Sequence, residues 1–150
     1  MKRALAAVAC AAALAGEAQQ PPVEVTVTPL EQAVKQGEKP VFHVVVRALE
    51  PTRVLDVARR DDIRDKVARP RMSGAESMDD IPVDLKPLGA ITDADYVDIK
   101  PGQAYVFDTH GEPLRLETLP PGTYGATIRY RRDMAAPLVN ANRVTFTVSR

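Results

Sequence analysis

The sequence predicts an all-β protein, an antiparallel β-sandwich of about seven to nine short strands. Apolar and polar residues alternate in several short segments, as in strands with one face in a core and one in water. Turn-forming residues separate these segments at spacings of roughly 8–12 residues. The chain also shows no long helical period and no internal repeat. We therefore expect a single sandwich domain over 23–150.

The clearest strands lie in the first half of that domain. Alternation predicts strands over 23–28, 41–49 and 52–57, with a crossing loop between the first two. In the second of these strands the even-numbered residues would face the core. His43 and Arg47 would then lie on its outer face.

A short helical insert is predicted near 60–68. Ile63 and Val67 lie four positions apart, which places both on one face of a helix. Asp61 is positioned to cap the first turn. Pro70 is expected to end the helix, because proline cannot continue the hydrogen-bond ladder.

The second half of the chain is expected to supply the remaining strands. Turns are predicted at 100–103 and 108–111, and loops over 71–80 and 137–142, where Gly, Pro, Asn and Asp gather. The predicted extended segments cover 81–88, 96–99, 104–107, 124–130 and 144–148.

A short stretch at 120–124, PPGTY, is typical of a corner between strands. Pro121 and Gly122 suit a tight turn, and Tyr124 follows at the start of a strand. In a tyrosine corner the ring packs at the sandwich edge, and the hydroxyl bonds to the main chain a few residues upstream. We expect these residues to be structural.

The first 18 residues have the pattern of a secretory signal peptide. Lys2 and Arg3 precede an apolar run, and small residues favour cleavage after Ala15 or Ala18. The run is shorter than the about 20 residues of a membrane span. It also continues past Cys10, the only cysteine, which argues against a lipid anchor there. A tether over 19–22 follows, and we expect a periplasmic or secreted protein without a membrane span.

The charge balance of the chain excludes a nucleic-acid partner. Without the signal peptide, 18 basic and 19 acidic residues remain of the 20 of each kind, so the basic surplus of a nucleic-acid binder is missing. A basic block over 59–71 precedes an acidic block over 76–98. These blocks would either neutralise one another or present a polarised binding surface.

No pattern for catalysis, a cofactor or a metal is found. Asp93 and Asp95 begin like a calcium loop, but Val97 stands where an oxygen ligand is needed, so a solvated acidic edge is expected instead. His43 and His110 lack partners at zinc-site spacing. We therefore expect a non-catalytic protein with no cofactor.

The arginines after the corner are the best candidate for binding. Arg129 and Arg131 alternate with Ile128 and Tyr130, so both would lie on the outside of one strand. Together with His43 and Arg47 they would form one basic strip that binds carboxylates or an acidic surface. The alternative is pairing with Asp or Glu on neighbouring strands.

Two stretches, VDIKPGQAYVFD and LRLETLPPGTYGATIRY, resemble the C-terminal half of bacterial secreted immunoglobulin-like domains. Similar domains form the pro-region of deuterolysin-like metallopeptidases or occur as small proteinase-inhibitor-like proteins. The resemblance implies an immunoglobulin-like sandwich that binds a protein partner such as a peptidase. A binder of small anionic ligands or envelope polymers is the alternative. The predicted partner-binding residues are Arg47, Arg59, Arg60, Arg64, Arg129 and Arg131.

Overall fold

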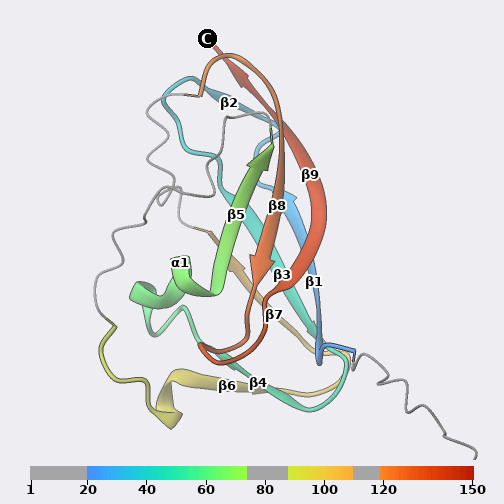
Figure 1. Cartoon of the computed structure of the whole chain (residues 1–150), viewed down its shortest axis with the longest axis vertical. Helices are drawn as coiled ribbons and strands as arrows, with labels where there is room; N and C mark the ends of the chain where they lie inside the picture. The colour runs from blue at the N-terminus through green and yellow to red at the C-terminus, as the bar shows by residue number, and fades with distance from the viewer. Residues whose placement is uncertain (1–19, 74–87, 110–118) are drawn as a thin grey trace, which may run out of the picture.

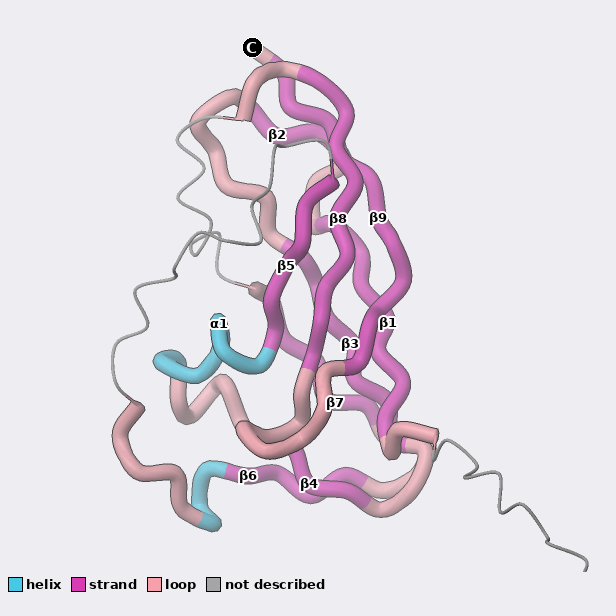
Figure 2. The backbone as a smooth tube through the Cα atoms, viewed as in Figure 1, coloured by secondary structure: helices cyan, strands magenta, loops and turns pink. Residues whose placement is uncertain are grey.

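The computed structural model describes residues 20–73, 88–109 and 119–150. Their strands form two packed sheets and a separate two-stranded ribbon (Figures 1 and 2). The prediction of an all-β, largely antiparallel sandwich is confirmed. The predicted signal peptide, with Cys10, lies outside the described residues, as do most of the expected strand over 81–88 and His110. Among the described residues, no helix has the length and apolar character needed to span a membrane.

The three-stranded sheet contains β1 (Val23–Pro29), β3 (Phe42–Ala48) and β7 (Ala104–Asp108), in the order β1-β3-β7 and antiparallel throughout. The predicted alternation is confirmed, because the even-numbered residues of β3 are all buried. Strand β7 is longer than expected. Thr109 continues its pairing with Phe42 instead of entering the predicted turn.

The four-stranded sheet contains β2 (Ala33–Lys35), β5 (Ala68–Ser73), β8 (Gly122–Tyr130) and β9 (Val139–Ser149). Its order is β2-β9-β8-β5, and β2 runs parallel to β9. The predicted crossing loop over 30–40 therefore contains a strand. Only one residue of β2 is buried, so its sequence shows too little alternation to be recognised.

The ribbon pairs β4 (Thr52–Leu55) with β6 (Tyr96–Ile99). Tyr105 ties it to the three-stranded sheet: its hydroxyl donates to Asp56 Oδ1 at 2.8 Å and accepts from the Val57 amide at 2.9 Å. Burial, followed by the hydrogen bond to Asp56, raises the pKa of Tyr105 to about 12. The hydroxyl therefore stays a donor at every physiological pH.

Aromatic rings join the two sheets in the core. Phe42 of β3 meets Phe146 of β9 edge to face, with 5.8 Å between the ring centroids. Tyr124 of β8 stacks on the same Phe146 at 5.9 Å. Phe107 and Tyr130 form a second contact between the sheets at 6.2 Å. The core therefore lies between the inner faces of the two sheets, as a sandwich requires.

The corner prediction is confirmed. The Tyr124 hydroxyl donates to the Pro120 carbonyl at 2.6 Å, four residues upstream, and its ring is buried against Phe146. Pro121 lies at a bend, and Gly122 is the first residue of β8. The stretch is a structural corner that directs β8 into the core.

The helical insert is present, but it ends earlier than predicted. A 3-10 turn, η1 (Asp61–Ile63), leads into α1 (Arg64–Val67), and both Ile63 and Val67 are buried. Asp61 pairs with Arg64 Nη2 at 3.0 Å, and no side-chain cap is present. The expectation that Pro70 ends the helix is wrong, because β5 begins at Ala68 and includes the proline. Among the described strands β5 pairs only with β8, and such an edge position tolerates the missing amide of proline.

Asn140 and Asn142 belong to β9, although a loop was predicted there. The Asn142 side chain links β9 to β1: its Oδ1 accepts from the Val27 amide at 2.7 Å, and its Nδ2 donates to the Val27 carbonyl at 3.0 Å. Its amide group thus pairs with β1 as the main chain of a neighbouring strand would. This link holds the two sheets together at one edge of the sandwich.

One buried hydroxyl gives a testable prediction. The Tyr130 side chain is 1% exposed, and its hydroxyl has no hydrogen-bond partner in the part of the chain that the structure describes. An unsatisfied buried donor costs about 1–3 kcal/mol. Tyr130→Phe is therefore expected to leave the free energy of unfolding unchanged or to raise it by up to that amount, as measured by urea denaturation. A loss of more than 1 kcal/mol would mean that the hydroxyl has a partner.

Candidate functional site

The six predicted arginines do not form one surface. Arg47 is exposed on the outer face of β3, whereas Arg129 lies on β8. Strand β3 pairs with β1 and β7, and β8 pairs with β5 and β9. The predicted strip through these arginines and His43 is therefore wrong, because its two halves lie on different sheets. His43 instead pairs with Asp108, with 2.7 Å between Nδ1 and Oδ1.

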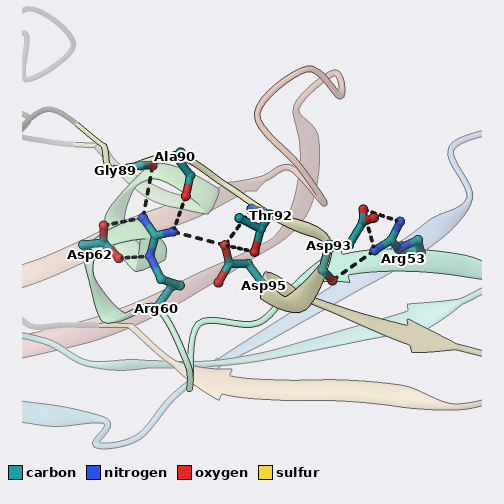
Figure 3. Close-up of polar contacts among 8 residues, drawn as sticks. All are labelled: Arg53, Arg60, Asp62, Gly89, Ala90, Thr92, Asp93 and Asp95. Carbon is teal, nitrogen blue, oxygen red and sulfur yellow. Dashed lines mark hydrogen bonds and ion pairs between the residues drawn. The ribbon is translucent and has the colours of Figure 1, made fainter.

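Arg60 is occupied by contacts within the protein (Figure 3). Its Nε and Nη2 each donate to Asp62 at 2.8 Å, and its Nη1 donates to Asp95 at 3.2 Å. The same guanidinium also donates to the carbonyls of Ala90 and Gly89, at 3.2 and 3.3 Å. We call these five residues the Arg60 clamp. It fastens the segment from Gly89 to Asp95 onto the insert.

The Arg60 clamp shows that the basic and acidic blocks contact one another, because Arg60 belongs to the first and Asp95 to the second. Arg53 makes similar contacts just outside the basic block. It lies within 3.4 Å of Asp93 and 3.5 Å of Asp98. Neutralisation within the fold therefore accounts for these groups.

Arg64 and Arg59 differ in their surroundings. Arg64 pairs with Asp61 and donates to the Asp108 carbonyl at 2.7 Å, and its side chain is 19% exposed. Arg59 is exposed. Within the insert, Arg60 and Arg64 therefore hold the structure together, and Arg59 faces solvent.

Acidification is expected to weaken the Arg60 clamp. The hydrogen bond from Arg60 is the main cause that lowers the pKa of Asp62, and a backbone hydrogen bond from Thr92 is the main cause for Asp95. A carboxyl group with a lowered folded pKa stabilises the protein above its unfolded pKa of about 3.9. That contribution is lost as the pH falls through the folded value.

Arg60→Gln tests this dependence. The urea midpoint of the variant is expected to lie below that of the parent protein at pH 7, and the gap between the two midpoints should narrow as the pH is lowered towards about 3. The gap narrows because protonated carboxyl groups lose their attraction for the guanidinium, whereas its hydrogen bonds to the carbonyls of Ala90 and Gly89 do not depend on pH. A gap between the midpoints that stays constant with pH would contradict this account.

The outer face of the four-stranded sheet differs from the insert, because its own strands supply no acidic residue to pair with its arginines. Its four strands contain no Asp or Glu. Arg129 of β8 lies on this face and is half-buried; Arg143 of β9 lies next to Thr127 in register and is exposed. At the edge, β5 brings the backbone of Arg69 opposite Arg129 and that of Arg71 opposite Thr127. We call the positions Arg69, Arg71, Arg129, Arg131 and Arg143 the basic sheet face.

Hydroxyl side chains also lie on the same face. Thr123 and Thr147 lie opposite one another on β8 and β9, and Thr145 lies opposite Gly125. All three threonines are exposed. The alternative expectation, pairing with Asp or Glu on neighbouring strands, is confirmed for His43, which pairs with Asp108 of β7. It is wrong for Arg129, whose register partners are Arg69 and Asn140.

Arg131 lies where the basic sheet face meets the insert. Its Nε donates to the Lys66 carbonyl near the end of α1, at 2.8 Å. This contact fixes the arginine stem, and the residue remains half-buried. Arg131 therefore supports the face and is held by the helix.

Sequence reasoning missed three positions of the basic sheet face: Arg69, Arg71 and Arg143. The first two were assigned to the helical insert and the loop after it, and Arg143 followed a predicted loop. One signal was available in the sequence. The segments 122–130 and 139–149 contain no acidic residue, which is unusual in a chain with equal numbers of acids and bases.

The arginines of this face carry hydrogen-bond donors that suit anions. Arginine presents five donors in a planar fork that matches carboxylate and phosphate oxygens. Over 20–73, 88–109 and 119–150, no three His, Cys, Asp or Glu side chains gather as a metal site would need. The described residues therefore offer anion recognition as their clearest chemistry.

Comparison with the models of known protein families finds no match, and comparison with curated proteins finds none either. The resemblance to immunoglobulin-like pro-regions of metallopeptidases therefore stays a prediction.

Proposed function

We propose that this chain is an exported, non-catalytic sandwich domain that binds an anionic polymer of the cell envelope through the basic sheet face. One observation carries the proposal: Arg129 and Arg143, on the neighbouring strands β8 and β9, lie on the outer face of a sheet whose strands contain no carboxylate. Charge complementarity then favours an anionic partner. Export rests on the pattern of residues 1–18.

The composition of the face favours a polymer over a protein partner. Protein interfaces concentrate aromatic and apolar side chains at their centre. The exposed large apolar residues of the described chain, Leu30, Leu49, Val106 and Leu138, all lie outside the four strands of this sheet. Arginines and threonines alone suit a chain of charged and hydroxyl-bearing units, which is held by charge-assisted hydrogen bonds and by release of counterions.

A peptidase or other protein partner remains a prediction from the resemblance. The insert was expected to supply its contacts, but Arg60 and Arg64 are occupied by the fold. The described geometry therefore supports the sheet face better than the insert.

The proposal is tested by reversing two charges on the basic sheet face and, as a control, two charges elsewhere on the surface. The Arg129→Glu/Arg143→Glu protein is expected to bind polyphosphate or polyglutamate about 100-fold more weakly than the parent, because each lost charged hydrogen bond is worth about 1.5–3 kcal/mol. Arg47→Glu/Arg59→Glu makes the same change of net charge at exposed positions elsewhere. Affinities are measured by titration calorimetry at several salt concentrations, and folding is checked by circular dichroism.

Two outcomes would count against the proposed function. Equal losses in the two double variants would show that net charge, and not the sheet face, governs binding. If the parent protein binds neither polymer at low salt, the basic sheet face is no polyanion site.

A further inference from the structure

Arg129 has a donor that the fold leaves unsatisfied. Its Nε is buried and has no hydrogen-bond partner in the part of the chain that the structure describes. Leaving a buried donor without a partner costs about 1–3 kcal/mol, and more when the group is charged. Native structures contain few such groups, and each calls for an explanation.

The register neighbours of Arg129 in the sheet carry no negative charge. Its backbone partner on β5 is Arg69, and its partner on β9 is Asn140. Arg131 follows directly after β8, and its Nε is already bonded to the Lys66 carbonyl. These neighbours therefore bring no carboxylate to Arg129, and a bound anion would satisfy the Nε donor.

Arg64 is a structural arginine, and its charge compensation differs from that of Arg129. Its Nε is also buried without a partner. However, its two Nη atoms contact Asp61 and the Asp108 carbonyl, so the guanidinium charge is compensated within the fold. Arg129 stands on a sheet without carboxylates and has no such compensation among the described residues.

We propose that Arg129 is the centre of a discrete oxyanion site that takes a phosphate group, to which the side chain turns so that its Nε becomes accessible and donates side by side with one Nη to two of its oxygens. This inference rests on the proposed function and specifies which anionic group the polymer carries. A guanidinium fork already uses both oxygens of a carboxylate. A phosphate monoester or terminal phosphate group has a third free oxygen and more charge, so it can also accept from a second arginine of the face.

The phosphate group has two sources, a polymer or the free ion, and separate arms of the experiment distinguish them. The probes are inorganic phosphate and polyphosphate, with polyglutamate as the carboxylate comparison. The full protein labelled with ¹⁵N is used, and the arginine Nε–H resonances are followed during each titration. The Arg129 resonance is assigned by its loss in Arg129→Lys.

We expect polyphosphate to shift the Arg129 Nε–H resonance in a saturable manner and to leave the Arg64 resonance in place. Arg64 is the matched control, since its Nε is also buried and unpartnered. Arg129→Lys keeps the charge but cannot donate side by side, so its affinity for polyphosphate should fall about tenfold or more. Arg47→Lys should bind as the parent does. Tighter binding of polyphosphate than of inorganic phosphate assigns the polymer as the source.

Four results would overturn the inference. Unchanged affinity in Arg129→Lys, or an unmoved Arg129 resonance at saturation, would show diffuse attraction without a discrete site. The proposed function would survive that result if Arg129→Glu/Arg143→Glu still lost binding. Equal affinity for polyglutamate, with the same resonance shifted, would remove the preference for phosphate. Failure of the parent to bind either polymer would defeat the proposed function together with this inference.

Discussion

Replacing Tyr124 by alanine is expected to lower the free energy of unfolding by about 3–5 kcal/mol, as for other core aromatic residues. The ring is only 8% exposed and stacks on Phe146, which itself meets Phe42 of the opposite sheet. Truncation would leave a cavity at the point where the two sheets join. It would also remove the hydrogen bond to the Pro120 carbonyl that holds the corner.

Urea denaturation of the purified protein measures this effect, and Tyr124→Phe separates its two parts. The phenylalanine keeps the ring and removes only the hydroxyl, so its cost should be about 0.5–1.5 kcal/mol. If Tyr124→Ala melted like the parent, the tyrosine would not be part of the core. If Tyr124→Phe cost as much as the alanine, the hydrogen bond and not the ring would dominate.

Asn142→Ala is expected to cost about 1–3 kcal/mol, the penalty for leaving buried polar groups without partners. The Asn142 side chain satisfies both the amide and the carbonyl of Val27, a residue that is fully buried. Alanine leaves both main-chain groups without this partner. It also removes a direct link between β1 and β9, so the edge of the sandwich should open more readily.

Asn140→Ala is the matched control for this effect. Asn140 lies two positions earlier on the same strand and is exposed. Its replacement should change the free energy of unfolding by no more than about 0.5 kcal/mol, as at other surface positions. Amide hydrogen exchange at Val27 provides a second measurement, and it should accelerate in Asn142→Ala only. Equal effects of the two variants would show that the side-chain link to β1 is not specific.

The two charged regions of this protein have different roles. In the insert, Arg60 and Arg64 are occupied by carboxylates and carbonyls of the same chain. On the four-stranded sheet, the arginines stand among arginines and threonines. Charge at the insert therefore serves stability, which the pH dependence of the Arg60 clamp tests. The charge on the sheet is the basis of the proposed recognition of an anionic polymer.

Local patterns in the sequence predicted the strands that have one buried face. The strand over 96–99 and the corner at Tyr124 agree with the structure residue by residue. Both depend on neighbours within a few positions along the chain, either through alternation or through the reach of a tyrosine hydroxyl. These local patterns predict the structure correctly because they do not depend on which distant segment lies beside them.

The errors concern segments whose conformation depends on a distant partner. Residues 33–35 become a strand because β9 offers a free edge, and Pro70 is tolerated because β5 is itself an edge strand. Asn142 looked like a loop residue, yet its amide pairs with β1 more than a hundred positions away. In each case tertiary pairing overrode local preference.

The sequence by itself determined that Arg129 faces outwards, because it alternates with buried Ile128 and Tyr130. Only the tertiary structure decided which residues accompany it. Alternation with a period of two separates the two faces of one strand, but it carries no information about which strand lies beside it. Sheet order separated Arg129 from Arg47 and brought it to Arg143 and the Arg69 position. The strand order therefore places arginines that are far apart in the sequence in one candidate site.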